Sequence, residues 1–171
     1  MKVGLIGAGR QGWRRAQAVK ELKETELAIV ADVDYNAAKL LAKDIGCDAT
    51  NNWEDVVSSS DLEAVIVCTP NHLHAPMSIA AIRRKKHVFC EKPLARDPEE
   101  AKQIVDTARE EGVKLKCGFT LRHHPGIQQA REWFDRGFIG KLIFLRCRYG
   151  MCGRLGYEKE WRARVEFSGG G

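Results

Sequence analysis

The sequence of 171 residues has no apolar stretch near the roughly 18 residues that are needed to cross a bilayer. Its apolar opening runs from Val3 to Gly9 and stops at Arg10, which is too short for the core of a signal peptide. These absences argue against a membrane protein and predict a soluble chain in the cytoplasm. Since domains usually contain about 100–200 residues, the length predicts one domain, or one domain and part of another.

Metal-binding cysteine patterns are also missing. None of the six cysteines forms a Cys-x-x-Cys pair, and no set of Cys and His has zinc-finger spacing. We therefore expect no metal site. Cys68, Cys90 and Cys117 each lie in an apolar run that is typical of a strand, which predicts buried free thiols in a reducing compartment.

The chain has no strong excess of charge. Its 28 Lys and Arg against 23 Asp and Glu give a net charge of +5, and the basic residues are scattered apart from Arg-Arg-Lys-Lys at 83–86. That run is typical of a helix end that faces solvent, with a polyanion-binding patch as the alternative. We expect neither a nucleic-acid partner nor a membrane partner.

Short apolar runs alternate with helical patterns along residues 1–120. Strands are predicted at 3–6, 27–31, 64–68, 87–90 and 114–119, and helices at 10–22, 36–44, 53–57, 76–84 and 97–112. Asn36 is the predicted cap of the second helix and Gly46 its stop, Pro76 is predicted to open the fourth, and Asp97 caps the fifth. This alternation predicts an α/β fold with a doubly wound parallel sheet.

The pattern continues weakly beyond residue 120. A helix is predicted at 126–136 and a strand at 142–149, and residues 151–171 show no clear periodicity. With a boundary near 118–125, we expect one domain at 1–120 and a second, incomplete one at 121–171.

A glycine-rich string, Gly7-Ala8-Gly9-Arg10-Gln11-Gly12, follows the first strand and opens the first helix. The pattern G-x-G-x-x-G is weak alone, but in this context it is typical of dinucleotide binding in a Rossmann fold. Gly7 permits the tight turn, Gly9 lets the backbone approach a pyrophosphate, and Gly12 lets the helix pack closely on the strand. The helix amino terminus then presents N–H groups to the phosphates, and Arg10 and Gln11 lie in the same cradle. A glycine-rich turn without a ligand is the alternative.

An acidic residue, Asp32, ends the second strand about 20 residues after Gly12, where such folds bind the ribose hydroxyls of the coenzyme. A carboxylate there would repel a 2′-phosphate, and no Arg or Lys follows at once. The position therefore favours NAD over NADP, while a surface Asp at a strand end is the alternative.

Three later motifs narrow the prediction: Cys68-Thr69-Pro70-Asn71-His72-Leu73-His74, Glu91-Lys92-Pro93-Leu94 and Arg122-His123-His124-Pro125. With the glycine loop, their order and spacing resemble the Gfo/Idh/MocA family of NAD(P)-dependent sugar and cyclitol dehydrogenases. The resemblance covers essentially the whole chain, and Glu-Lys-Pro after a buried strand is its most specific part.

The resemblance implies the roles of seven residues. A loop along the coenzyme would comprise Thr69, Pro70, Asn71 and His74, while Glu91 and Arg122 would lie near the nicotinamide and Lys92 near the substrate hydroxyl. It also implies that the Lys92–Pro93 peptide bond is often cis.

Lys92 is the candidate catalytic residue. It follows a strand at the carboxyl edge of the sheet, where open α/β sheets bind ligands. A lysine there can move a proton to or from a carbinol, and burial would favour its neutral amine. A solvated lysine is the alternative. Loop or capping roles are equally compatible with His72 and His74, and His123 and His124 are expected to be extended surface residues.

The chain departs from the family pattern at its end. Ser168-Gly169-Gly170-Gly171 matches only the beginning of a motif that continues in the family with Gly-x-His and an Asp, so the resemblance implies a truncated start of an α+β substrate domain. The strand at 142–149 would then lack partners. We expect the region after residue 120 to be poorly ordered or to pair with another copy, and the full-length form to be a homo-oligomer.

Three functions follow from these patterns. The first is an oxidoreductase that moves a hydride between NAD(H) and a secondary alcohol of a sugar, nucleotide sugar or cyclitol. The second is an NAD-binding chain that is catalytically incomplete. The third is a basic interaction protein that uses a doubly wound fold.

Overall fold

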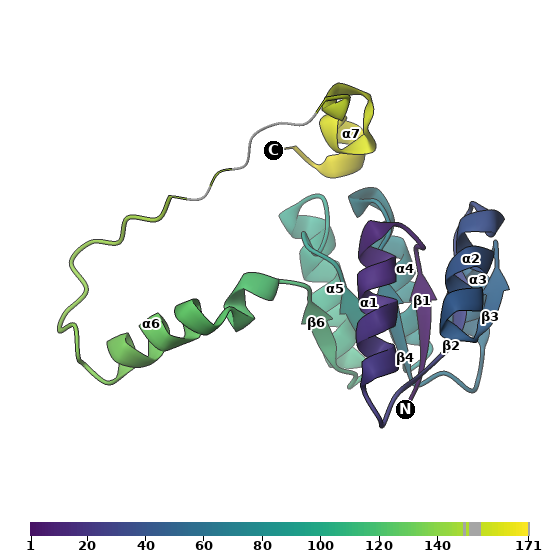
Figure 1. Ribbon diagram of the computed structural model, residues 1–171, viewed down its shortest axis with the longest axis horizontal. Helices are drawn as coiled ribbons and strands as arrows, with labels where there is room; N and C mark the ends of the chain where they lie inside the picture. The colour runs from purple at the N-terminus through teal and green to yellow at the C-terminus, as the bar shows by residue number, and fades with distance from the viewer. Residues whose placement is uncertain (149, 151–154, 171) are drawn as a thin grey trace.

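The computed structural model describes residues 1–148, 150 and 155–170, and its centre is a six-stranded parallel sheet (Figure 1). The strand order is β3-β2-β1-β4-β5-β6. The chain therefore starts near the centre of the sheet, adds β2 and β3 on one side of β1, and then adds β4, β5 and β6 on the other. The strands are β1 (Lys2–Ile6), β2 (Glu26–Ala31), β3 (Asp48–Thr50), β4 (Ala64–Val67), β5 (His87–Cys90) and β6 (Leu115–Cys117). This order confirms the predicted doubly wound α/β fold.

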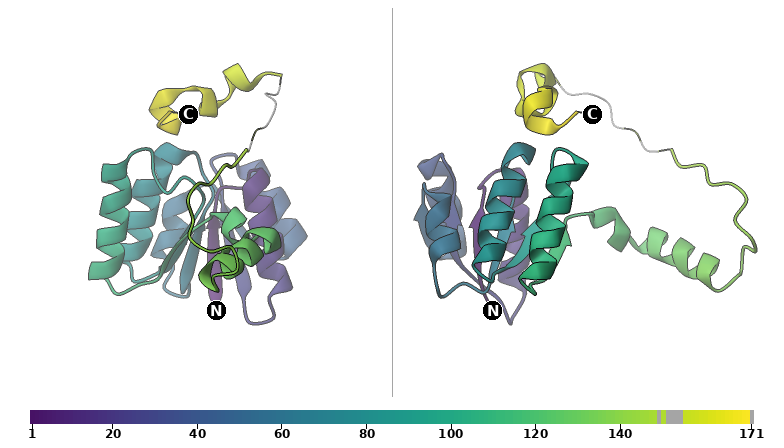
Figure 2. Two further views of the ribbon diagram at one scale, coloured as in Figure 1. Left: turned by 90° about the vertical axis from the view of Figure 1, so that its left-hand side faces the viewer. Right: turned by 180° about the vertical axis from the view of Figure 1, so that it is seen from behind.

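Helices cover both faces of the sheet (Figure 2). They are α1 (Arg10–Glu21), α2 (Tyr35–Ile45), α3 (Trp53–Ser58), α4 (His74–Arg83) and α5 (Pro98–Glu110). Along β4, Val65 and Val67 pack in the cluster formed with α3, α4 and α5, whereas Ile66 packs in the cluster formed with α1 and α2. Because successive strand residues point to opposite faces, a sheet buried on both sides requires continuous apolar strands.

The start of α2 differs from the sequence prediction. The helix begins at Tyr35, and its cap is Asp34 rather than Asn36, since the Asp34 carboxylate accepts hydrogen bonds from the backbone N–H of Asn36 (3.0 Å) and Ala37 (3.3 Å). The predicted stop at Gly46 is confirmed, and this residue has a left-handed φ of 89°.

Two more local predictions are corrected. Helix α4 begins at His74, so Pro76 lies inside its first turn instead of opening it. Strand β3 was not expected, because three residues beginning with an exposed Asp48 are too few for an alternating pattern to be visible. It gains its strand geometry from pairing with β2.

The region after β6 leaves the sheet. A 3-10 turn, η2 (Thr120–His123), leads into α6 (Pro125–Asp135), which extends away from the sheet in Figures 1 and 2. His124 is extended, as expected, and its ring accepts a hydrogen bond from the N–H of Gly126, whereas His123 is in the turn rather than extended.

The predicted strand at 142–149 is wrong for the part that the structure describes. Residues 142–148 form no strand, and Tyr149 lies outside the described residues. Ile143, Phe144 and Leu145 have the apolar, β-forming character of a strand but are 93%, 76% and 75% exposed. A strand needs a neighbour to satisfy its backbone, and none of the described strands lies beside this segment.

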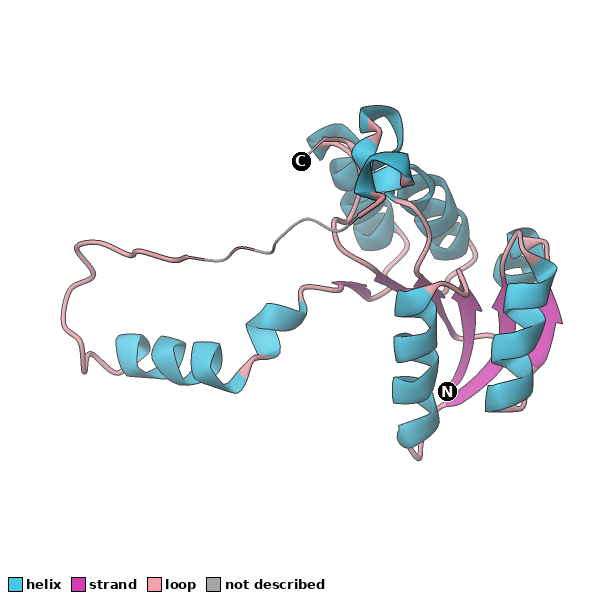
Figure 3. Cartoon of the chain, turned by 45° about the horizontal axis from the view of Figure 1, so that its top comes forward, coloured by secondary structure: helices cyan, strands magenta, loops and turns pink. Residues whose placement is uncertain are grey.

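The last described segment returns to the sheet. Residues 155–170 contain the short turns η3 (Tyr157–Lys159) and η4 (Trp161–Ala163) and the single-turn helix α7 (Val165–Ser168). Figures 1 and 3 show them beyond the carboxyl ends of the strands, where α7 contacts η1 (Asn71–Leu73). The sequence pattern did not predict this contact.

The basic run at 83–86 is only partly exposed to solvent. Arg83, the last residue of α4, and the two residues after it are exposed. Lys86 is 4% exposed, and its ammonium donates to the carbonyl oxygens of Leu62 (2.8 Å) and Ser59. Burial lowers the pKa of Lys86. The run therefore combines three exposed cations, of which Lys85 forms an ion pair with Glu111, and one buried cation that holds the loop at 59–62. Among the described residues, no helix is both long enough and apolar enough to span a bilayer.

The described cysteines are free thiols, but of the three that were predicted to be buried only Cys90 is fully buried. Cys90 is buried in β5, whereas Cys68 and Cys117 are half-buried and Cys147 is exposed. Burial raises the pKa of Cys90 to about 12 and that of Cys47 to about 11. Since the thiolate is the nucleophile, these two thiols should be slow to react.

We predict that iodoacetamide at pH 8 alkylates Cys147 at least about tenfold faster than Cys90, because Cys147 is exposed whereas Cys90 is buried and burial raises its pKa. Peptide mass spectrometry of the native protein over time measures both rates. The same reaction in urea is the control and should remove the difference. Equal rates in the native protein would contradict the burial of Cys90.

Candidate functional site

The glycine loop is built around two close backbone approaches. Gly7 has φ of 102°, and a Cβ there would lie 2.6 Å from the carbonyl oxygen of Cys68. A Cβ on Gly12 would lie 1.9 Å from the carbonyl oxygen of Gly7. Both positions therefore require glycine, and α1 can begin directly beside the end of β1 because Gly12 has no side chain.

Gly9 is different, because nothing lies within 4 Å of the position where its Cβ would be. It is the exposed N-cap of α1 and provides no side-chain cap. The first N–H groups of a helix have no acceptor inside the helix, so this end of α1 offers donors beside an open backbone surface. Arg10 is exposed and Gln11 half-buried in the same turn. Such an arrangement suits a phosphate group.

Asp32 lies beside this loop at the end of β2. One carboxylate oxygen accepts the N–H of Ala8 at 2.7 Å, and the other accepts the N–H of Asp34 at 3.0 Å. These bonds fix the half-buried carboxylate next to the glycine turn while each oxygen keeps a further lone pair for a ligand hydroxyl. The predicted proximity of Asp32 and the glycine loop is therefore observed.

The loop after β4 is fixed by the buried ring of His74. Its Nδ1 lies 2.8 Å from the carbonyl oxygen of Pro93, and its Nε2 lies 2.9 Å from the carbonyl oxygen of Thr69. Two facing carbonyls favour a protonated ring, but burial is the larger influence and lowers the pKa of His74. With both nitrogens engaged and 1% exposure, His74 joins the loops after β4 and β5 and is not itself open to a ligand.

The neighbouring Asn71 is buried, and its side-chain amide donates to the carbonyl oxygen of Ser168 at 2.8 Å. The ring of His72 lies 4.8 Å from that of Phe167, and its Nδ1 is buried with no hydrogen-bond partner among the described residues. The loop predicted to bind the coenzyme is thus in direct contact with α7.

Glu91 and Lys92 follow β5 at the same edge. Glu91 is 5% exposed, and its carboxylate accepts the Nε–H of Arg15 at 2.6 Å in an ion pair that also involves Arg15 Nη2. The other oxygen accepts the backbone N–H of Lys92 at 3.3 Å. The Lys92–Pro93 peptide bond is cis, as the resemblance implied.

The side chain of Lys92 is exposed. The burial expected for this lysine is therefore absent from the described structure, although its position at the carboxyl edge agrees with the prediction.

The sequence of this chain is similar to those of known proteins. The family model described as oxidoreductase family, NAD-binding Rossmann fold (Gfo/Idh/MocA) matches residues 1–119. The chain belongs to this family. Levoglucosan dehydrogenase from Pseudarthrobacter phenanthrenivorans is 30% identical over 158 residues, which cover 87% of this chain and 40% of that protein.

Two crystal structures of family members show the same fold. Myo-inositol 2-dehydrogenase from Lactobacillus plantarum has a TM-score of 0.78 and 27% identity over 84% of this chain and 43% of that one. A 3-ketoreductase from Actinomadura kijaniata in complex with NADP and TDP-benzene has a TM-score of 0.75 and 32% identity over 80% and 42% of the two chains. The chain therefore spans less than half the length of these relatives.

Arg122 is set apart from the other candidate residues of this Gfo/Idh/MocA protein. It is exposed in η2, and its guanidinium lies 5.2 Å from the ring centre of Phe119. Within the described residues, no hydrogen bond or ion pair joins it to Glu91 or Lys92. These residues also include no group of three or more His, Cys, Asp or Glu that could hold a metal ion.

Arg15 is the site residue that sequence reasoning missed. It extends from α1 across the edge to Glu91, and its guanidinium lies 4.8 Å from the ring centre of Phe89 in β5. One of several arginines on an amphipathic helix carries no sequence signal for such a contact. Only the folded sheet brings the helix after β1 next to the end of β5.

We predict that Arg15→Gln lowers the free energy of unfolding by about 2 kcal/mol, because it leaves the buried carboxylate of Glu91 without its cation. Urea unfolding followed by circular dichroism measures this loss. Arg14→Gln is the matched control, since Arg14 is an exposed neighbour on the same helix. Adding Glu91→Gln should recover part of the loss; equal stability of the two single arginine variants would contradict a stabilising pair.

Proposed function

We propose that this chain binds NAD(H) at the carboxyl edge of its sheet. The observation that supports the proposal is the open backbone at Gly9 beside the fixed carboxylate of Asp32. The first-turn N–H groups of α1 would hold the pyrophosphate, with Arg10 and Gln11 at its border, and Asp32 would accept hydrogen bonds from the ribose.

We infer that NAD is preferred to NADP. The Asp32 carboxylate would repel a 2′-phosphate, and the residues that follow it are Val33, Asp34 and Tyr35, none of them basic. The matching family model is described as NAD-binding, whereas one relative has NADP bound. We therefore base the preference on the local charge at Asp32 and not on membership of the family.

For the reaction, we propose that Lys92 accepts the hydroxyl proton of a secondary alcohol of a sugar, nucleotide sugar or cyclitol when the alcohol is oxidised. In the reverse direction it would donate a proton to the carbonyl oxygen of the corresponding ketone. Bound nicotinamide would supply or accept the hydride. Glu91, held by Arg15 and hydrogen-bonded to the N–H of Lys92, would position the backbone from which the lysine extends. Thr69 and Pro70 would lie along the coenzyme, and Arg122 would act near its nicotinamide end.

The exposure of Lys92 supports a second candidate function: NAD binding without turnover. A general acid or base works best in an environment that excludes water and adjusts its proton affinity, and residues 1–170 provide no such cover over Lys92 where the structure describes them. We propose that residues 1–120 form the coenzyme domain and 121–171 the first part of a substrate domain. Homo-oligomeric assembly and a cytoplasmic location stay predictions.

We predict that Gly9→Ala weakens NADH binding at least about tenfold and leaves folding nearly unchanged, because a methyl group fits the protein at residue 9 but fills the phosphate cradle. Gly12→Ala should instead lower stability by about 2–3 kcal/mol, since its methyl group collides with the Gly7 carbonyl. Titration of NADH fluorescence and thermal unfolding separate the two effects. Wild-type affinity in Gly9→Ala, or no binding by the wild type, would contradict the proposal.

We predict that Lys92→Met abolishes turnover of a panel of inositols, hexoses and nucleotide sugars but changes NADH affinity by less than about twofold, because an exposed side chain is removed without disturbing the cradle. Steady-state assays monitored at the NADH absorbance measure turnover. Lys114→Met, an exposed lysine before β6, is the control. Unchanged rates would reject the role of Lys92, whereas an inactive wild type that still binds NADH would favour the second candidate.

A further inference from the structure

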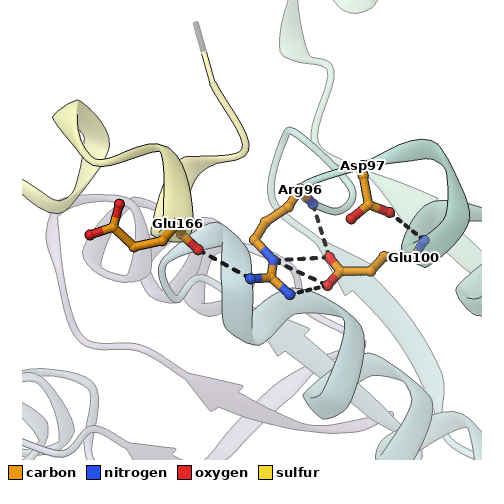
Figure 4. Close-up of polar contacts among 4 residues, drawn as sticks. All are labelled: Arg96, Asp97, Glu100 and Glu166. Carbon is orange, nitrogen blue, oxygen red and sulfur yellow. Dashed lines mark hydrogen bonds and ion pairs between the residues drawn. The ribbon is translucent and has the colours of Figure 1, made fainter.

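Helix α7 is attached to the carboxyl edge of the sheet by two side chains that follow different strands. The Nη1 of Arg96, after β5, donates to the carbonyl oxygen of Glu166 at 3.1 Å (Figure 4). The amide of Asn71, after β4, donates to the carbonyl oxygen of Ser168 at 2.8 Å. Both acceptors belong to the single turn of α7, and carbonyls at the carboxyl end of a helix lack partners within the helix.

A helix of four residues is not stable through its own hydrogen bonds. Fixing the backbone of the first turn costs more conformational free energy than the hydrogen bonds of one turn recover. The conformation of residues 165–169 therefore depends on what the helix is docked against. A cation at its carboxyl end also has the favourable sign for the helix dipole. Arg96 thus provides a hydrogen bond and a charge at the one end of α7 that needs both.

Arg96 is itself held in place by Glu100, in the first turn of α5. Its Nε donates to Glu100 Oε1 at 3.1 Å, its Nη2 also contacts that oxygen, and its backbone N–H donates to Oε2 at 3.1 Å (Figure 4). The N–H of Glu100 is in turn capped by Asp97 at 2.8 Å. Bidentate pairing fixes the guanidinium plane, so that the free edge of Arg96 points at α7.

Backbone packing adds a third contact. A Cβ on Gly169 would lie 2.2 Å from the carbonyl oxygen of Arg96, and Gly169 has φ of 86°. The segment therefore approaches Arg96 more closely than any residue with a side chain permits. Gly170 also has a positive φ, of 102°, but nothing lies within 4 Å of its Cβ position. Both glycines therefore have a positive φ that favours glycine, but only Gly169 is in close contact with Arg96.

We propose that Arg96 and Asn71 are positioning residues that dock residues 165–169 against the coenzyme loops, and that this docking and dinucleotide binding stabilise each other. The proposal rests on the proposed function, because its coupling requires that the loop at 69–74 contacts the coenzyme. Asn71 lies in that loop, and its side-chain amide donates to the carbonyl oxygen of Ser168. A ligand that orders the loop therefore also orders residues 165–169. Linkage makes the effect reciprocal.

The test uses the 171-residue chain and the variant Arg96→Gln, with hydrogen exchange read by mass spectrometry on peptides covering 161–171. Without coenzyme, the amides of Phe167, Ser168 and Gly169 should exchange about tenfold faster than in the wild type, the effect of losing one charge-assisted hydrogen bond. Arg109→Gln, at the far end of α5 in an exposed ion pair with Asp106, is the matched control and should leave these rates unchanged.

A second pair of variants separates docking from general damage. Gly169→Ala should accelerate exchange of the same amides as Arg96→Gln does, because its methyl group collides with Arg96. Gly170→Ala carries a similar backbone penalty without the collision and should have a smaller effect. Equal exchange in all four variants and the wild type would overturn the docking.

The coupling is tested by adding NADH, and NADPH in parallel. In the wild type, saturating NADH should slow exchange at 167–169, and Arg96→Gln should bind NADH about three- to tenfold more weakly than Arg109→Gln while its thermal unfolding stays the same. Faster exchange in Arg96→Gln with unchanged NADH affinity would overturn the coupling. A wild type that binds neither dinucleotide would overturn the proposed function and the coupling together, whereas the exchange rates without coenzyme would still decide the docking.

Discussion

The contact between helix α1 and the turn after β1 determines the geometry of the whole carboxyl edge. The Gly7 carbonyl lies where a side chain on Gly12 would begin, so the helix can turn back along the sheet directly from the strand. That direction leaves Gly9 open at the start of the helix and, further along the helix, brings Arg15 to Glu91 at the end of β5. A bulkier residue at position 12 would displace both features at once.

The loops at this edge are joined to one another through polar side chains. His74 lies between the carbonyls of Thr69 and Pro93, Asn71 donates to Ser168, and Arg96 donates to Glu166. Three of these bonds pair a side chain with a backbone carbonyl of another loop, and the bond between His74 and Thr69 closes the loop after β4 on itself. They satisfy carbonyls that irregular segments leave without partners. The edge is therefore one connected surface, and a ligand that orders any loop acts on the others.

Some of these features were readable from the residues. Five of the six strands were found because a sheet covered on both faces needs continuous apolar runs. The close packing at Gly7 and Gly12 and the position of Asp32 beside them followed from a loop whose geometry depends on residue type. The cap at Asp34, the short β3 and the buried Lys86 were not found. Each depends on a partner distant in space or on an oxygen whose direction the sequence does not encode.

The segment at 142–148 shows the limit most clearly, since its residues have every property of a strand and yet form none where no neighbour lies beside them. The sequence by itself determined the parallel sheet, the glycine loop and the acid that accompanies it, because local conformation and burial pattern specify these. Only the tertiary structure decided which cation pairs with Glu91, how α7 docks and that the side chain of Lys92 is exposed. Those contacts join residues that lie far apart in the sequence, so their distances follow from the folded arrangement of the sheet, its helices and its loops.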